Sequence, residues 1–155
     1  MSTSTPEVPT SEPASVRPGQ RIRYRLLAVA AAVVGSGVVW AIVTQVFGVD
    51  LATPAIQGAP SVPVRLLDVV FNSAVASIAG WVLLALLEKF TTRAATAWLV
   101  VALVVFVLSL SLPMLGTGAT VGQRALLALF HVVVAAVLIP MLYRSSRQRF
   151  GAVAA

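Results

Sequence analysis

Four long apolar segments, separated by short polar ones, restrict the fold of this chain more than any other feature. They cover residues 26–47, 66–87, 94–115 and 125–143 and contain very few ionisable side chains. At about 1.5 Å of rise per residue, a helix of this length matches a bilayer hydrocarbon core of about 30 Å. The segments do not alternate between apolar and polar residues, which excludes the strands of a membrane barrel. The sequence therefore predicts four transmembrane helices.

The composition agrees with an integral membrane protein. Hydrophobic residues make up 59 % of the 155 residues and charged residues only 10 %. A soluble domain has about 45–50 % apolar and about 25 % charged residues. Such a chain has too few polar residues to cover a water-facing surface, so an ordinary soluble enzyme is excluded. We predict an all-α protein, an antiparallel four-helix transmembrane bundle over residues 23–144.

Both ends of the chain are polar. Residues 1–22 are rich in Ser, Thr and Pro, which predicts a disordered cytoplasmic tail. Residues 145–155 are predicted to form a basic cytoplasmic tail. Pro113 and Pro140 lie near the ends of the third and fourth segments, where we expect them to mark helix termination.

Three connections of different character join the segments. Residues 48–65 contain three prolines and predict an irregular loop, with room for one short interfacial turn. Residues 88–93 are enough for a tight hairpin, and residues 116–124 form a glycine-rich turn. Within that turn, Thr120 is suited to cap the fourth helix.

The basic residues indicate the orientation in the membrane. Nine of the eleven fall on one side of the predicted bundle, whereas Arg65 and Arg124 fall on the other. Because basic residues are retained on the cytoplasmic side, both termini and the 88–93 hairpin are predicted to be cytoplasmic in the plasma (inner) membrane. The nine are Arg17, Arg21, Arg23, Arg25, Lys89, Arg93, Arg144, Arg147 and Arg149.

The sequence offers little chemistry for catalysis. It has no cysteine, one histidine and five acidic residues, so we expect no metal site and no cofactor. No phosphate-binding glycine motif or nucleophile elbow is present, and we expect no enzymatic activity. The net charge of +6 lies at the ends of apolar segments, which favours lipid over nucleic acid as partner. Glu88 is most simply paired with Lys89 and Arg93 in the hairpin.

A few polar residues inside the segments predict a candidate pocket. Asp68 and Asn72 share one face of the second helix, while Arg124 and His131 lie on the fourth, with His131 near mid-membrane. An Asp68–Arg124 pair with His131 below it would form an outward-open pocket for a small polar ligand or a proton. Alternatively, Asp68 pairs with Arg65 or Arg124 only to fix helix register, and Asn72 and His131 form interhelical hydrogen bonds.

Small residues form a second pattern, because they let helices approach closely in lipid. Ser73, Ser77 and Gly80 line a face of the second helix distinct from the Asp68 face. This stripe packs within the bundle or forms an interface with a second copy or a partner protein. A matching set on the first helix consists of Ala28, Ala32 and Ser36.

A set of residues spread over residues 24–143 forms a recognisable pattern. It consists of Asp68, of Gly80, Trp81, Leu83 to Glu88 and Phe90, of Trp98, of Ser109, Leu110, Leu112 and Pro113, and of Leu129, His131, Ile139 and Pro140. In these residues the chain resembles a family of small four-helix membrane proteins, mainly of actinobacteria, defined as a domain of unknown function. The resemblance implies the four-helix fold and a bacterial plasma membrane, and it implies no activity, substrate or cofactor.

Three functions are considered, of which the least favoured is a membrane enzyme, because it would need a second titratable group next to His131. The other two are favoured over it. The first is a small, non-enzymatic membrane protein that associates with itself or with a membrane complex. The second is a small transporter or ligand-binding membrane protein that uses the pocket of Asp68, Asn72, Arg124 and His131. The lipid bilayer is the partner common to both.

Overall fold

The structure is a computed structural model that describes residues 18–55, 60–115 and 117–151. Within these residues it contains four long α-helices, one short π-helix and no β-strand, which confirms the all-α prediction. The elements are α1 (Pro18–Ala41), η1 (Ile42–Val46), α2 (Leu66–Phe90), α3 (Ala94–Leu115) and α4 (Val121–Gly151).

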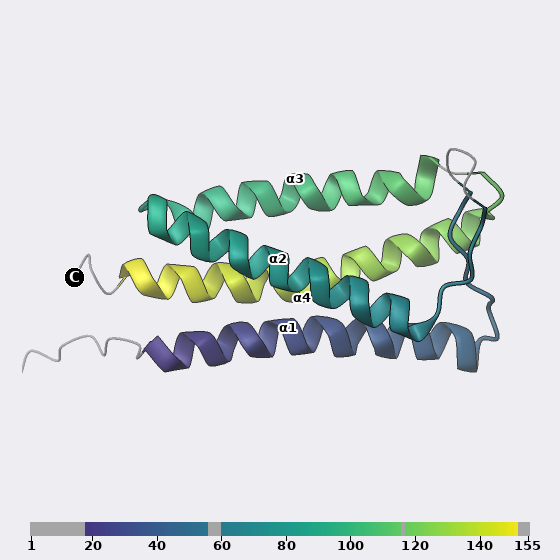
Figure 1. The fold of residues 1–155 in the computed structure, drawn as a ribbon, viewed down its shortest axis with the longest axis horizontal. Helices are drawn as coiled ribbons and strands as arrows, with labels where there is room; N and C mark the ends of the chain where they lie inside the picture. Colours follow the sequence, from purple (N-terminus) through teal and green to yellow (C-terminus); the bar gives the residue numbers. More distant parts are fainter. Residues whose placement is uncertain (1–17, 56–59, 116, 152–155) are drawn as a thin grey trace, which may run out of the picture.

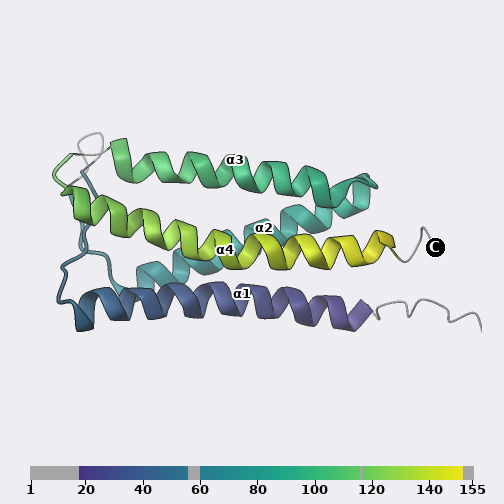
Figure 2. The same cartoon turned by 180° about the vertical axis from the view of Figure 1, so that it is seen from behind.

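The helices lie lengthwise beside one another (Figure 1). The start of α1, the α2–α3 connection and the end of α4 lie at one end, called here the basic end. The α1–α2 loop and the α3–α4 turn lie at the other, called here the loop end. Seen from behind, α1 and α3 are the outer helices (Figure 2). Both pack against α2 and α4, and their described residues do not pack against each other.

All four α-helices contain a stretch long and apolar enough to cross a membrane, as the sequence predicts. Only 17–22 % of the most apolar window of each stretch is buried inside the protein. Large apolar side chains such as Val34, Phe71 and Val107 therefore point outward, as is typical of helices surrounded by lipid. The stretches are Gly19–Val46, Leu66–Phe90, Ala94–Ser111 and Val121–Arg147.

The predicted beginning of the first helix and the predicted end of the fourth differ most from the structure. Helix α1 begins at Pro18, so residues 18–22 of the predicted disordered tail are helical, and residues 1–17 lie outside the described residues. A proline fits the first turn of a helix, where its missing N–H is not needed. Pro140 does not end the fourth helix: α4 continues to Gly151, so residues 145–151 of the predicted basic tail are helical, and residues 152–155 lie outside the described residues. A proline is tolerated inside a membrane helix because neighbouring groups can compensate for one lost hydrogen bond.

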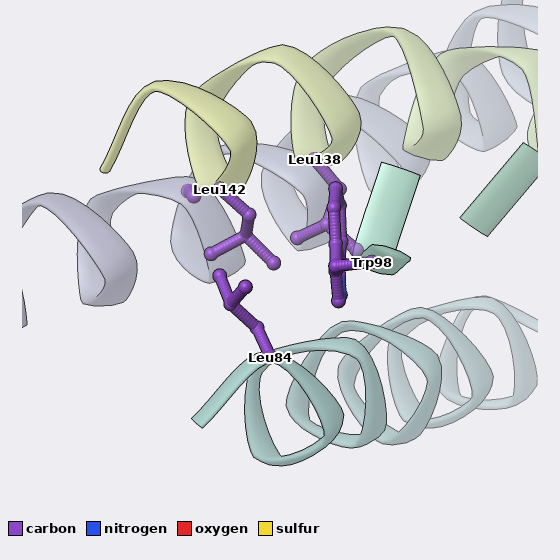
Figure 3. Packing of buried hydrophobic residues seen from close by; sticks show 5 residues of the cluster. Leu84, Trp98, Leu138 and Leu142 are labelled. Carbon is purple, nitrogen blue, oxygen red and sulfur yellow. The ribbon is translucent and has the colours of Figure 1, made fainter. Parts of the chain in front are cut away.

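The tightest packing lies toward the basic end. Trp98 of α3 is 1 % exposed and packs with Leu84 of α2 and with Leu138 and Leu142 of α4 (Figure 3). Its indole Nε1 donates a hydrogen bond of 2.9 Å to the carbonyl of Gly80. A Cβ at Gly80 would lie 3.4 Å from Leu138. The glycine therefore lets α4 approach α2 closely.

At the loop end, the connections are tied together by hydrogen bonds. Ala55 and Thr117 exchange two backbone hydrogen bonds of 3.0 and 2.9 Å, which join the α1–α2 loop to the α3–α4 turn. Leu51 of the loop is buried in a second apolar cluster with Phe130 of α4. The Thr120 hydroxyl accepts a 3.2 Å hydrogen bond from the N–H of Gln123, which confirms its predicted capping role.

Candidate functional site

A buried ion pair joins three helices near the basic end. A guanidinium nitrogen of Arg25 in α1 lies 2.5 Å from a carboxylate oxygen of Glu88 in α2. The Nε of Arg25 also donates a 3.2 Å hydrogen bond to the Ser145 hydroxyl of α4. The side chains of Arg25 and Glu88 are only 8 % and 6 % exposed. We call these three residues the ion-pair site.

The local sequence explains why these side chains point into the bundle. The buried positions of α1 include Arg25, Ala28, Ala32 and Ser36, which recur every three or four residues on one face. A similar periodicity in α2 ends at Glu88; its buried positions are Val69, Ser73, Ser77, Leu84 and Glu88. The ion pair thus lies on the same faces of α1 and α2 as the contact between Ser36 and Ser73.

Midway along this interface the contacts are small and polar. The Ser36 hydroxyl donates a 2.8 Å hydrogen bond to the Ser73 hydroxyl and also contacts the Val33 carbonyl at 2.9 Å. Ser77 is fully buried, and its hydroxyl has no hydrogen-bond partner among the described residues. Gly80 packs against Trp98 and α4. All three residues of the predicted Ser73, Ser77 and Gly80 stripe therefore lie inside the bundle.

The chemistry of the ion-pair site favours holding the helices together. Removing two charges from solvent is unfavourable unless they pair with good geometry and further hydrogen bonds. Arg25 meets both conditions, with Glu88 as counter-charge and Ser145 as a further partner. Ser146, next to Ser145, is also fully buried, and its hydroxyl has no partner in the described part of the chain. Ionisable residues within a membrane bundle commonly mark function, which makes this site a candidate.

The expected pairing of Glu88 within the hairpin is wrong. Helix α2 extends to Phe90, so Glu88 lies in its last turn and turns inward to Arg25. Lys89, in contrast, is exposed and lies 5.8 Å from the ring centroid of Phe90. The signal for this pairing was present in the sequence, because Arg25 and Glu88 extend the two small-residue stripes at the correct spacing.

The first two residues of the predicted pocket lie on an exposed face of α2. A carboxylate oxygen of Asp68 accepts a 2.9 Å hydrogen bond from the backbone N–H of Arg65, at the start of the helix. The Asn72 side chain donates a 2.7 Å hydrogen bond to the Asp68 carbonyl. Both side chains are exposed, and these contacts support the first turns of α2.

The other two pocket residues lie partly buried on α4. The Arg124 guanidinium donates hydrogen bonds to the carbonyls of Met114, at 2.6 Å, and Ala119, at 3.2 Å. The Nδ1 of His131 lies 2.8 Å from the Leu127 carbonyl of the same helix. None of these three hydrogen bonds connects Arg124 or His131 to Asp68. The pocket of Asp68, Asn72, Arg124 and His131 therefore stays a prediction.

No group of three or more His, Cys, Asp or Glu side chains that could hold a metal ion occurs among the described residues. The arrangement of charges is instead that of a structural junction between α1, α2 and α4. The fold and this junction define a class: small bundles of four membrane-length helices with an internal ion pair.

The chain belongs to a family of unknown function, DUF6069, whose model matches residues 16–148. The match includes all four helices apart from the last residues of α4, together with Arg25, Glu88 and Ser145. No curated protein and no solved structure gives a match to this chain.

Proposed function

We propose that this protein is a multi-pass protein of the bacterial plasma membrane, folded as an antiparallel bundle with both termini in the cytoplasm. The distribution of charge supports this orientation. The basic end carries Arg23, Lys89, Arg93 and Arg144 as exposed cations. Its acid Glu88 is buried against Arg25, so the charges displayed there are positive. Positive charge beside transmembrane helices is retained on the cytoplasmic side.

Within the membrane, we propose that the protein acts by association with itself or with a larger membrane complex, without catalysis of its own. The observation that carries this proposal is that charged side chains of the bundle bind groups within the protein itself. Arg25 and Glu88 bind each other, and Asp68 binds the start of its own helix. Apart from polar side chains such as Asp68 and Asn72 near the start of α2, the spans expose many large apolar side chains to their surroundings. Helices associate in lipid through close packing of such surfaces.

The outer face of α3 is the surface best placed for this association. Among the described elements, α3 packs against α2 and α4 only, which leaves its other side uncovered by them. Val100, Val104 and Val107 follow one another at helical spacing on this face and are 56 %, 52 % and 64 % exposed. Branched, rigid side chains in a row form a ridge that a second helix can pack against.

Cysteine crosslinking in native membranes tests the proposal. Single cysteines replace Val100, Val104 and Val107, with Ala95, which is 8 % exposed on α3, as the matched buried control. Oxidation is expected to give dimers, or adducts with a larger protein, from the exposed positions and none from Ala95→Cys. A chain that gives no adduct from any exposed position on the four helices, and that migrates as a monomer, contradicts association.

A further inference from the structure

We infer that the last turns of α4 form a binding site for the phosphate of an anionic phospholipid headgroup. The inference rests on the proposed insertion in a membrane and adds a ligand to it. The site is an open cavity of about 520 Å³ lined by Pro140, Tyr143, Arg144 and Arg147. We call these four residues the α4 groove.

The geometry of α4 places two guanidinium groups on one side of the helix. Arg144 and Arg147 are exposed and three residues apart, so they are neighbours on the helix surface. Between them, Ser145 and Ser146 are buried at 3 % and 0 % exposure and face the bundle. The helix is therefore held on its serine side by Arg25, while its arginine side faces outward.

The aromatic ring of Tyr143 positions one of these cations. The guanidinium carbon of Arg147 lies 5.8 Å from the centroid of the Tyr143 ring, within the range of a cation–π contact. Such a contact reduces the freedom of a long side chain and leaves its N–H groups available. A guanidinium offers paired donors that match two phosphate oxygens, which an ammonium group does not.

The position of the α4 groove along the helix favours a lipid over a soluble anion as its ligand. Tyr143 is the last residue of the apolar segment 125–143. Tyrosines prefer the boundary between the hydrocarbon core and the lipid headgroups. In the proposed insertion, Arg144 and Arg147, which follow Tyr143 along α4, reach the level of the lipid phosphates. Lys89 and Arg93, also at the basic end, add to the positive field that attracts anionic lipids. The chemistry recognised is thus a phosphodiester presented at the membrane surface.

Native mass spectrometry of the full chain tests this inference. The protein is released from nanodiscs containing phosphatidylglycerol and phosphatidylcholine, and bound lipids are identified. The wild type is expected to retain phosphatidylglycerol in preference to phosphatidylcholine. The double variant Arg144→Gln/Arg147→Gln is expected to lose that preference by about tenfold, as the loss of charged hydrogen bonds implies. Both side chains are exposed, and circular dichroism checks that the helices remain.

A matched control removes the same charge elsewhere at the basic end. Arg21→Gln/Arg23→Gln, in the first turns of α1, is expected to reduce retention less than Arg144→Gln/Arg147→Gln does, because it weakens only the general attraction to anionic lipid. Equal losses in both double variants would show a general charge effect and overturn the site, as would a wild type without lipid preference. Excess inorganic phosphate that displaces the lipid would reassign the groove to a soluble anion. Insertion and oligomeric state are read from the same samples, which separates these outcomes from failure of the proposed association.

Discussion

Replacement of Glu88 by glutamine is expected to lower the free energy of unfolding by about 3–5 kcal/mol. The substitution keeps the size of the side chain but leaves the guanidinium of Arg25 buried without a counter-charge. Reversible unfolding in mixed micelles, followed by circular dichroism, measures the effect. The control is Lys89→Gln at the adjacent exposed position, where a change within about 0.5 kcal/mol is expected.

A double variant separates the contribution of the two charges to stability from the contribution of side-chain packing. Arg25→Met/Glu88→Met removes both charges together and fills the space with apolar side chains, so most of the lost stability should return. Arg25→Met alone should be destabilising, because it leaves the carboxylate of Glu88 buried and without its guanidinium partner. A Glu88→Gln variant as stable as Lys89→Gln would show that the pair does not hold the three helices together.

Replacement of Trp98 by alanine is expected to produce the second large effect. The indole is 1 % exposed and fills the space between α2 and α4, so its removal opens a cavity beside Leu138 and Gly80 (Figure 3). Such truncations cost about 3–5 kcal/mol in soluble cores. Because lipid is as apolar as the protein interior, the transfer part is smaller, and we expect about 2–3 kcal/mol in micelles.

The variant Trp98→Phe separates the ring from its hydrogen bond. Phenylalanine keeps most of the packing but cannot donate to the Gly80 carbonyl, so a loss of about 1 kcal/mol is expected. The same unfolding measurement compares the two variants. If Trp98→Ala and Trp98→Phe had the same free energy of unfolding, the packing of the indole would not hold α3 against α2 and α4.

The helices could be predicted from the sequence because lipid solvent leaves few alternatives. A long apolar segment must satisfy its backbone internally, so residues 66–87 and 94–115 had to be helical. The ends were harder, because the polar residues at the start of α1 and the end of α4 are compatible with helix or tail. Ser145 and Ser146 extend α4 by packing into the bundle, and this tertiary contact leaves no local signal.

The ion-pair site was missed although Arg25 and Glu88 continue the two small-residue stripes, because a stripe indicates which face of a helix is buried and not which residue it contacts. Arg25 and Glu88 are 63 positions apart, and near them in sequence lie other charges that make a local pairing plausible. Only the register between α1 and α2 brings them together, and that register is fixed by contacts such as Ser36 with Ser73. For Asp68, the sequence predicted which face of the helix it lies on but not its partner. Its contact with the Arg65 backbone depends on where α2 begins.

The proposed topology, in which the four helices cross a membrane with the ion-pair end in the cytoplasm, is tested by labelling single cysteines. Single cysteines at Ser61 in the α1–α2 loop and at Thr92 in the α2–α3 hairpin are unambiguous reporters, because the sequence has no cysteine and both positions are exposed. A membrane-impermeant maleimide applied to intact cells should label Ser61→Cys and should label Thr92→Cys only after permeabilisation. Equal labelling of both positions in intact cells would contradict the account.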